Sequence, residues 1–240
     1  IEVSKNGTLF KTSNGGEVLT NDGIKILAEN FEYDKSKLIL TASQDVEFID
    51  KEKNIIIKAE KITYFKNKEN IIAEGYVEVN DTENNLTLNS NKLSYSKNEE
   101  KIIADENVLL NDFKNNVIIN SKKIIYFKNI NKFYSEGNTT AKIQTKYTFE
   151  GSDIFFFKNE MRLQSSKKTQ IIDDNNTKYT LGSFNYQIND EFLKATKIEI
   201  IENFNLSNNT TNKYYFEDGF FDLKQKNFKT GLAKIHLKKK

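Results

Sequence analysis

Apolar and polar residues alternate along much of the chain, and this alternation indicates β-strands rather than helices. In one segment the apolar face runs through Ile57 and Ala59 and then continues through Ile62 and Tyr64, so its parity changes once. A one-residue change of this kind is typical of a β-bulge, which bends a strand sharply. The change recurs twice at equivalent positions further along the chain, so we expect these strands to bend at the same height.

The alternation repeats with a fixed step of 31 residues. The recurring columns are Tyr33, Tyr64, Tyr95 and Tyr126; Lys35, Lys66, Lys97 and Lys128; Ala28, Ala59, Ser90 and Ser121; Ala42, Ala73, Ala104 and Ser135; and Val46, Val77 and Val108. A fixed period without insertions means that one supersecondary unit is stacked on copies of itself. Such a protein builds its surface along its length, so we expect function along the stack rather than at one catalytic spot.

Each period predicts a β-hairpin with strands of about 9–10 residues, or roughly 30 Å. Polar turns are expected at 66–70 and 80–84 and at their equivalents, with their charged side chains in solvent. Proline is absent, which suits long ladders because proline removes a ladder donor.

The repeats are regular over 23–166 and diverge over 167–240. Within the diverged part, 203–212 is rich in Asn, Ser and Thr and is expected to be a long loop. No segment has the composition of a linker strong enough to separate independent domains, so a single domain is expected over 1–240.

Composition excludes some partners and leaves the compartment open. There are 36 basic and 34 acidic residues, so the net charge is +2 and no strong field directs the chain to nucleic acid. Arg162 is the single arginine, although arginine is the preferred fork for phosphate and guanine. There is no cysteine, and no apolar run approaches the ~18–20 residues of a membrane helix. The chain begins at Ile1 rather than Met, so we expect a processed piece whose export signal was removed.

Side chains for catalysis are scarce, so we expect no enzyme, no cofactor and no metal site. A Ser/His/Asp triad would depend on His236, the single histidine, which lies beside the C-terminal lysines. The acidic stretch 173–176 lacks the alternating spacing of a calcium loop and is expected to be a turn. Glu99 and Glu100 lie in a periodic turn and need no catalytic explanation.

The apolar columns allow two interpretations. In one, they form the dry core of a stack; in the other, the two arms of each bent hairpin stay apart and line a groove. Small residues favour the groove, since a tight core would hold bulky side chains at these mid-strand positions. They are Ala59, Ala73, Ser90, Ala104 and Ser121. A groove would suit extended alkyl chains, because each buried methylene contributes about 0.8 kcal/mol.

Two consecutive segments resemble the OstA repeat of the lipopolysaccharide-transport proteins. They read Ala59-Glu60-Lys61-Ile62-Thr63-Tyr64 and Ile72-Ala73-Glu74-Gly75-Tyr76-Val77-Glu78-Val79. The resemblance covers about 23–145 well and the remainder loosely. Within the family it is nearest to the N-terminal periplasmic domain of LptD-type outer-membrane assembly proteins, and next to LptA-type periplasmic bridge proteins.

The resemblance implies an all-β fold, an open, twisted antiparallel β-jellyroll that stacks the 31-residue hairpins in a V-shaped section. It implies non-enzymatic passage of lipopolysaccharide through the periplasm of a Gram-negative cell toward the outer membrane, with the lipid A acyl chains inside a hydrophobic groove. By carry-over, the groove is lined by Phe31, Tyr33, Leu40, Val46, Phe48, Ile57, Ile62, Tyr64, Val77, Val79, Leu88, Leu93, Val108, Leu110, Ile119 and Ile124.

The implied partners are lipopolysaccharide and an LptA-like bridge protein, which would pair with the N-terminal edge up to about Ala28. An LptD-type protein would add its own C-terminal barrel, which is absent from these residues, and a plug lipoprotein. No nucleic acid partner is expected. LptD proteins tie this domain to the barrel through cysteines, and this chain has none, so that tether is absent here or made outside these residues.

Two other classes fit part of the pattern. A structural or adhesive β-solenoid would have a dry core and no lipid ligand, but common β-helix coils are shorter and parallel, whereas short polar turns suit antiparallel hairpins. A transmembrane barrel would need strands of about 9–11 residues with one apolar face. Lysines lie in both sets of turns and paired aromatic girdles are missing, which disfavours the barrel.

Overall fold

The computed structural model describes residues 1–21, 23–204, 212–225 and 227–236. Over these ranges the chain forms β-strands and two 3₁₀ turns, η1 (Lys66–Lys68) and η2 (Lys128–Ile130), without an α-helix. No helix in the described part has the length and apolar character of a membrane span. The prediction of an all-β fold is confirmed. Most of the loop predicted at 203–212 lies outside the described residues.

The chain divides into two compact units. Unit 1 comprises Ile1–Lys114 and Lys123–Asn129, and unit 2 comprises Asn115–Lys122 and Ile130–Lys240. Strand β11 (Val117–Phe127) contributes residues to both, and each unit is described by itself.

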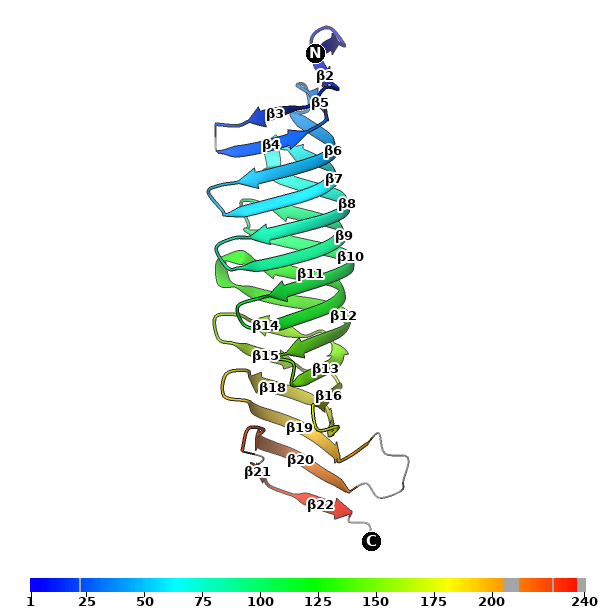
Figure 1. Cartoon of the computed structure of the whole chain (residues 1–240), viewed down its shortest axis with the longest axis vertical. Helices are drawn as coiled ribbons and strands as arrows, with labels where there is room; N and C mark the ends of the chain where they lie inside the picture. Colours follow the sequence, from blue (N-terminus) through cyan, green and yellow to red (C-terminus); the bar gives the residue numbers. More distant parts are fainter. Residues whose placement is uncertain (22, 205–211, 226, 237–240) are drawn as a thin grey trace. The chain divides into compact units, whose positions relative to one another are not determined.

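Unit 1 is a stack of antiparallel strands, which follow chain order from β6 to β10 (Figure 1, blue to green). Its strands are β1 (Glu2–Ser4), β2 (Leu9–Thr12), β3 (Gly16–Leu19), β4 (Ile24–Ala28), β5 (Asn30–Asp34), β6 (Ile39–Asp50), β7 (Ile55–Phe65), β8 (Asn70–Asp81), β9 (Leu86–Ser96) and β10 (Lys101–Asp112). The strands from β6 to β10 have 11 or 12 residues, slightly more than the sequence predicts, and consecutive strands form the expected hairpins.

Each long strand of unit 1 belongs to two layers. In layer A, β3 pairs with β4 and β4 with the half of β6 that ends at Asp50, as in Ile26↔Phe48. In layer B, β1, β2 and β5 continue to the other half of β6, as in Phe31↔Ala42. The backbone joins the layers where the strands bend. On the opposite side, which we call the mouth, the ladders of the described residues stay within one layer.

The bend coincides with a shift of ladder register. In the β6–β7 ladder, Ser43↔Lys61 is followed by Val46↔Ala59, so β6 carries one residue more than β7. Strand β8 carries one more than either neighbour, and β10 one more than β9. The predicted bend is therefore confirmed, but the extra residue lies in the even-numbered strands. Strands β7 and β9 change only the parity of their buried face.

Residues at the bend adopt a left-handed backbone with the period of the sequence repeat. The column comprises Gln44 (φ 66°), Gly75 (φ 77°), Glu106 (φ 64°) and Gly137 (φ 81°). Side chains with a Cβ disfavour this conformation, so glycine relieves strain at two of the four positions. At Gly75 an added Cβ would also clash with the side chain of Glu60, whereas at Gly137 it would meet nothing within 4 Å.

Both sets of turns end on a left-handed residue. In layer A the position is held by Asn54 and Asn85, and asparagine tolerates this conformation better than most residues. In layer B, η1 ends at Glu69, whose φ is 49°. The predicted turn at 80–84 begins later than expected, because β8 extends to Asp81.

Unit 2 repeats the two-layer arrangement with shorter strands. They are β12 (Lys132–Ile143), β13 (Tyr147–Ser152), β14 (Phe155–Phe157), β15 (Arg162–Ser165), β16 (Thr169–Asp173), β17 (Lys178–Leu181), β18 (Ser183–Gln187), β19 (Phe192–Ile201), β20 (Lys213–Asp222), β21 (Asn227–Thr230) and β22 (Ala233–His236). One half of β12 pairs with β13 and the other with β14, so the bend of unit 1 becomes a break between two strands.

Candidate functional site

The residues predicted to line a groove are mostly buried, so the space expected between the arms is filled rather than open. Fifteen of them are at most 7% exposed, and Tyr33 is partly buried. The fifteen are Phe31, Leu40, Val46, Phe48, Ile57, Ile62, Tyr64, Val77, Val79, Leu88, Leu93, Val108, Leu110, Ile119 and Ile124. These side chains are buried, and the gap expected between the arms is closed by side chains of both layers.

Aromatic residues account for the closure in unit 1. Phe48 of layer A lies 6.3 Å from Tyr64 and 6.4 Å from Tyr95, both of layer B, with the rings at 62° and 78°. Edge-to-face pairs at this separation are favourable beyond the area that they bury. Because the removal of apolar surface from water lowers the free energy, layers with these side chains close on each other.

The small residues do not form a channel. Ala59, Ala73, Ser90 and Ala104 are at most 8% exposed and lie beside the register shifts at the bend. At the bend the two layers converge on the backbone that joins them, so little room remains there for a long side chain. The small columns are therefore explained by the bend rather than by a stripe left free for an alkyl chain.

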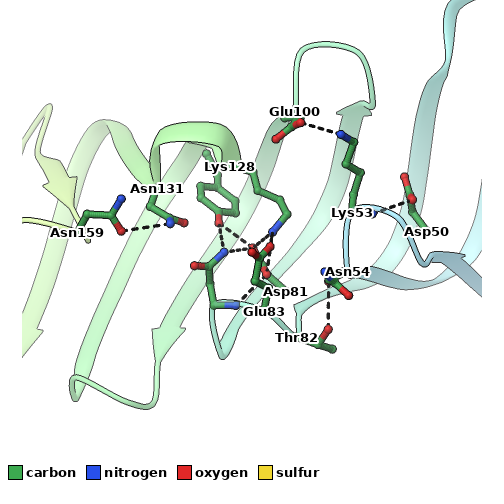
Figure 2. A network of polar contacts seen from close by, with 12 residues as sticks. Asp50, Lys53, Asn54, Asp81, Thr82, Glu83, Glu100, Lys128, Asn131 and Asn159 are labelled. Carbon is green, nitrogen blue, oxygen red and sulfur yellow. Dashed lines mark hydrogen bonds and ion pairs between the residues drawn. The ribbon is translucent and has the colours of Figure 1, made fainter.

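Polar side chains close the mouth of unit 1 (Figure 2). Asp81 ends β8 in layer A and is 2% exposed. It accepts a hydrogen bond of 2.7 Å from the Tyr126 hydroxyl, and its two oxygens lie 3.0 and 3.1 Å from Lys128 Nζ, both of layer B. Lys128 Nζ also lies 2.9 Å from Glu83 Oε2. Asn84 completes the cluster by donating to Asp81 Oδ2 at 2.9 Å.

The same contacts recur one period earlier. Asp50 is fully buried and accepts a hydrogen bond of 3.3 Å from the Tyr95 hydroxyl. Lys97 Nζ lies 3.9 Å from Asp50 and 3.3 Å from Glu52. Lys53 of layer A forms an ion pair of 2.8 Å with Glu100 of layer B.

We call these two groups of contacts the clasp. It comprises Asp50, Glu52, Lys53, Tyr95, Lys97 and Glu100, and Asp81, Glu83, Asn84, Tyr126 and Lys128. Burial first, and then the neighbouring aspartate, raise the pKa of the Tyr95 and Tyr126 phenols well above the ordinary value of 10.0. Both tyrosines therefore stay protonated and act as donors.

Unit 2 holds a contact of the same kind. The carboxylate of Glu191, in the turn between β18 and β19, accepts from Lys146 Nζ at 2.6 Å and from the Tyr147 hydroxyl at 2.9 Å, both beside the turn between β12 and β13. Burial acts to raise the pKa of Glu191, but these two hydrogen bonds outweigh it and hold the pKa below the ordinary value of 4.5. The acid thus stays ionised in neutral solution.

The sequence shows the tyrosine and lysine columns of the clasp as periodic, but it does not reveal that their side chains contact each other. The lysines were expected in solvent, but Lys97 and Lys128 are 7% exposed, so that expectation is wrong for these two. A third column, Asp50, Asp81 and Asp112, has the same period and was overlooked. An acid, a tyrosine and a lysine that recur together would have indicated contacts between turns one and a half repeats apart.

Unit 2 also contains unfilled space. A cavity of about 270 Å³ lies at its C-terminal end, among side chains of both layers. Its apolar lining includes Tyr179, Ile200, Phe216, Phe221 and Phe228.

The other predicted features give no catalytic centre in the described part of the chain. The stretch 173–176 forms a turn, in which Asp173 Oδ1 accepts from the backbone N–H groups of Asn175 and Thr177. No cluster of described residues has the donors to hold a metal ion. His236 lies in β22, and its side chain lies outside the described atoms.

The first strands of unit 1 are exposed edges. Among the described residues, β1 pairs with β2 alone and β3 with β4 alone. Val3 and Leu19 on these strands are 56% and 67% exposed. A strand edge with free backbone groups is a template for pairing with another chain.

Comparison with known proteins finds a likeness among solved structures alone. No family model matches the chain, and no curated protein matches it. Among solved structures, the chain is similar to LptH, the LptA homologous periplasmic component of the conserved lipopolysaccharide transport device from Pseudomonas aeruginosa. The identity is 14% and the TM-score 0.42, over 48% of this chain and 82% of that chain.

Proposed function

We propose that the chain is a non-enzymatic lipid carrier of the lipopolysaccharide-transport type, which holds the acyl chains of lipopolysaccharide in the interior between its two layers. The proposal rests on the OstA-like repeat in the sequence and on one geometric observation. Among the described residues of unit 1, backbone joins the layers at the bend and the ladders stay within one layer elsewhere, while side chains close the mouth.

This arrangement permits the interior to open without breaking a ladder. The strand pairs of each layer keep their hydrogen bonds if the layers separate at the mouth, because the ladders lie within the layers. Opening exposes the apolar interior to water. Each lipid methylene that is then buried against it contributes about 0.8 kcal/mol to binding. A barrel closed by backbone hydrogen bonds would not have this freedom.

The charges of the buried interior agree with an apolar ligand. In unit 1 the buried charged residues are Asp50, Asp81, Lys97, Asp112 and Lys128, all at strand ends or in turns. Between the mouth and the bend the buried side chains are aliphatic or aromatic. An acyl chain would meet no unpaired charge there, and a charged headgroup would remain at the mouth.

The lipopolysaccharide path also requires partners at the ends of the stack. We propose that the exposed edges of β1 and β3 pair with a strand of an LptA-like bridge protein, as an added antiparallel strand. An LptD-type protein would in addition carry an outer-membrane barrel and bind a plug lipoprotein. Localisation in the periplasm follows from the same proposal.

Native mass spectrometry of the purified chain tests the proposal. We expect a mass increase equal to bound lipid after incubation with lipid A, and none with the same phosphorylated disaccharide after its acyl chains have been removed. Binding of the deacylated sugar, or no binding of lipid A, would contradict a carrier that holds acyl chains.

A second candidate is a structural stack with a permanently dry core. The burial of the predicted groove residues favours it, since the core of unit 1 is already filled. The two candidates differ in whether the mouth ever opens. Hydrogen exchange separates them, because a dry core should protect the amides of both layers equally with and without lipid A.

A further inference from the structure

The clasp is an unusual way to close an apolar interior. Buried ion pairs contribute little net stability, because the desolvation of both charges offsets their attraction. Apolar side chains at the same positions would close the mouth at least as firmly. The clasp nevertheless recurs with the 31-residue period, at Asp50 and again at Asp81.

The chemistry of the clasp differs from that of a permanent seam. Its contacts are side-chain contacts between turns, so all of its groups can be hydrated when the layers separate. Lys97 and Lys128 then stand at the layer B lip of the open mouth, because each lies in the turn that follows a layer B strand. The released carboxylates stand on the opposite lip, in layer A.

We propose that the clasp is a side gate: it opens to admit acyl chains from the side, and the anionic headgroup of the bound lipid then replaces Asp50 and Asp81 as the partner of Lys97 and Lys128. This inference rests on the proposed lipid-carrier function and adds the route of entry and the headgroup class. An ammonium group is suited to this exchange, since it binds carboxylate and phosphate alike as a point charge.

The gate can be tested by cross-linking because the chain has no cysteine of its own. Lys51 and Asn98 are exposed and lie in turns on opposite sides of the mouth, in layers A and B. A thiol-reactive cross-linker in the Lys51→Cys/Asn98→Cys variant would hold the mouth closed. The matched control is Asn98→Cys/Asn129→Cys, whose two residues are exposed and lie in the layer B turns.

Lipid A is added before or after cross-linking, and bound lipid is read by native mass spectrometry. We expect the cross-mouth link to weaken binding at least roughly tenfold, since the open form becomes scarce, and the control link to leave binding unchanged. Equal binding by both linked variants overturns the gate while the carrier function stands. Absence of binding in the unlinked chain overturns both.

The headgroup exchange has its own readout. We compare lipid A with the same lipid after its phosphates have been removed, using the wild type, the neutral variant Asp81→Asn/Lys128→Gln and the control Lys58→Gln, whose side chain is exposed. The wild type and control should prefer the phosphorylated lipid, and the neutral variant should lose part of that preference. Equal affinity of the wild type for both lipids would overturn the exchange.

Discussion

At the scale of single residues, the fold depends on positions with a positive φ angle and on the hydrogen bonding of buried tyrosine hydroxyls. Gly75 and Gly137 occupy the left-handed column at the bend. Tyr126 donates to the carboxylate of Asp81, whereas the buried hydroxyl of Tyr186 has no hydrogen-bond partner among the described residues. These pairs of positions allow each effect to be measured against a matched control.

Replacement of Gly75 by alanine should destabilise unit 1 more than the equivalent change destabilises unit 2. Gly137→Ala adds only the left-handed strain of about 1–2 kcal/mol, since its Cβ meets nothing nearby. Gly75→Ala adds a clash that involves the Cβ of Glu60 as well as its carboxylate, so its loss should exceed that of Gly137→Ala. Urea unfolding of both variants measures the difference, and equal losses would contradict the geometry of the bend.

The two buried tyrosines should respond in opposite directions to loss of the hydroxyl. Tyr126→Phe removes a hydrogen bond to a buried carboxylate and should lower the free energy of unfolding by about 1.5–3 kcal/mol. Tyr186→Phe removes an unpaired buried hydroxyl and should be neutral or stabilising by about 1 kcal/mol. Thermal unfolding of the two variants is the measurement, and a large loss for Tyr186→Phe would mean that its hydroxyl is bonded.

At the scale of elements, the bent strand and the turn are the repeating parts. The alternation of apolar residues predicts the hairpins, their buried faces and the height of the bend, because these depend on local spacing. It places the extra residue in the wrong strands, because a change of parity in β7 and β9 is the visible response to a bulge in their partners. Gly75 and Gly137, which are separated by two periods or 62 residues, were the sequence signal of the left-handed position at the bend.

The clasp joins two turns that lie far apart in the sequence, so no local pattern could reveal its contacts. Asp81→Ala alone should cost about 3–5 kcal/mol, because Lys128 is left buried without its main partner. Asp81→Ala combined with Lys128→Met should cost less than the sum of the single changes by about 0.5–3 kcal/mol. A double-mutant cycle in denaturant measures this coupling, and strict additivity would show that the pair is not formed in solution.

The contact of Glu191 should make unit 2 sensitive to acid. The folded-state pKa of this carboxyl is lowered, so its contribution to stability is present above the ordinary value of 4.5 and is lost as the pH falls through the lower folded-state pKa. The difference in free energy of unfolding between the wild type and Glu191→Gln should therefore be constant near neutral pH and shrink below pH 4.5. A difference independent of pH would contradict the ionised contact with Lys146.

At the scale of the whole molecule, the sequence predicts an all-β stack of hairpins, and the structure confirms it in each unit. Burial along the long strands follows the same alternation. The sequence could not predict whether the two layers touch. The separation of the layers depends on how Phe48, Tyr64 and Tyr95 pack against one another, and those residues meet across strands that the chain order keeps apart.

The central claim is that acyl chains occupy the interior of a stack that is closed at rest. Site-specific photo-cross-linking to lipid A tests it most directly, with a photoreactive phenylalanine analogue at Phe48, which is fully buried, and at Tyr76, which is 84% exposed. The account expects a lipid adduct from position 48 and little from position 76. Adducts from position 76 alone, or equal labelling of both, would contradict it and leave a stack with a dry core.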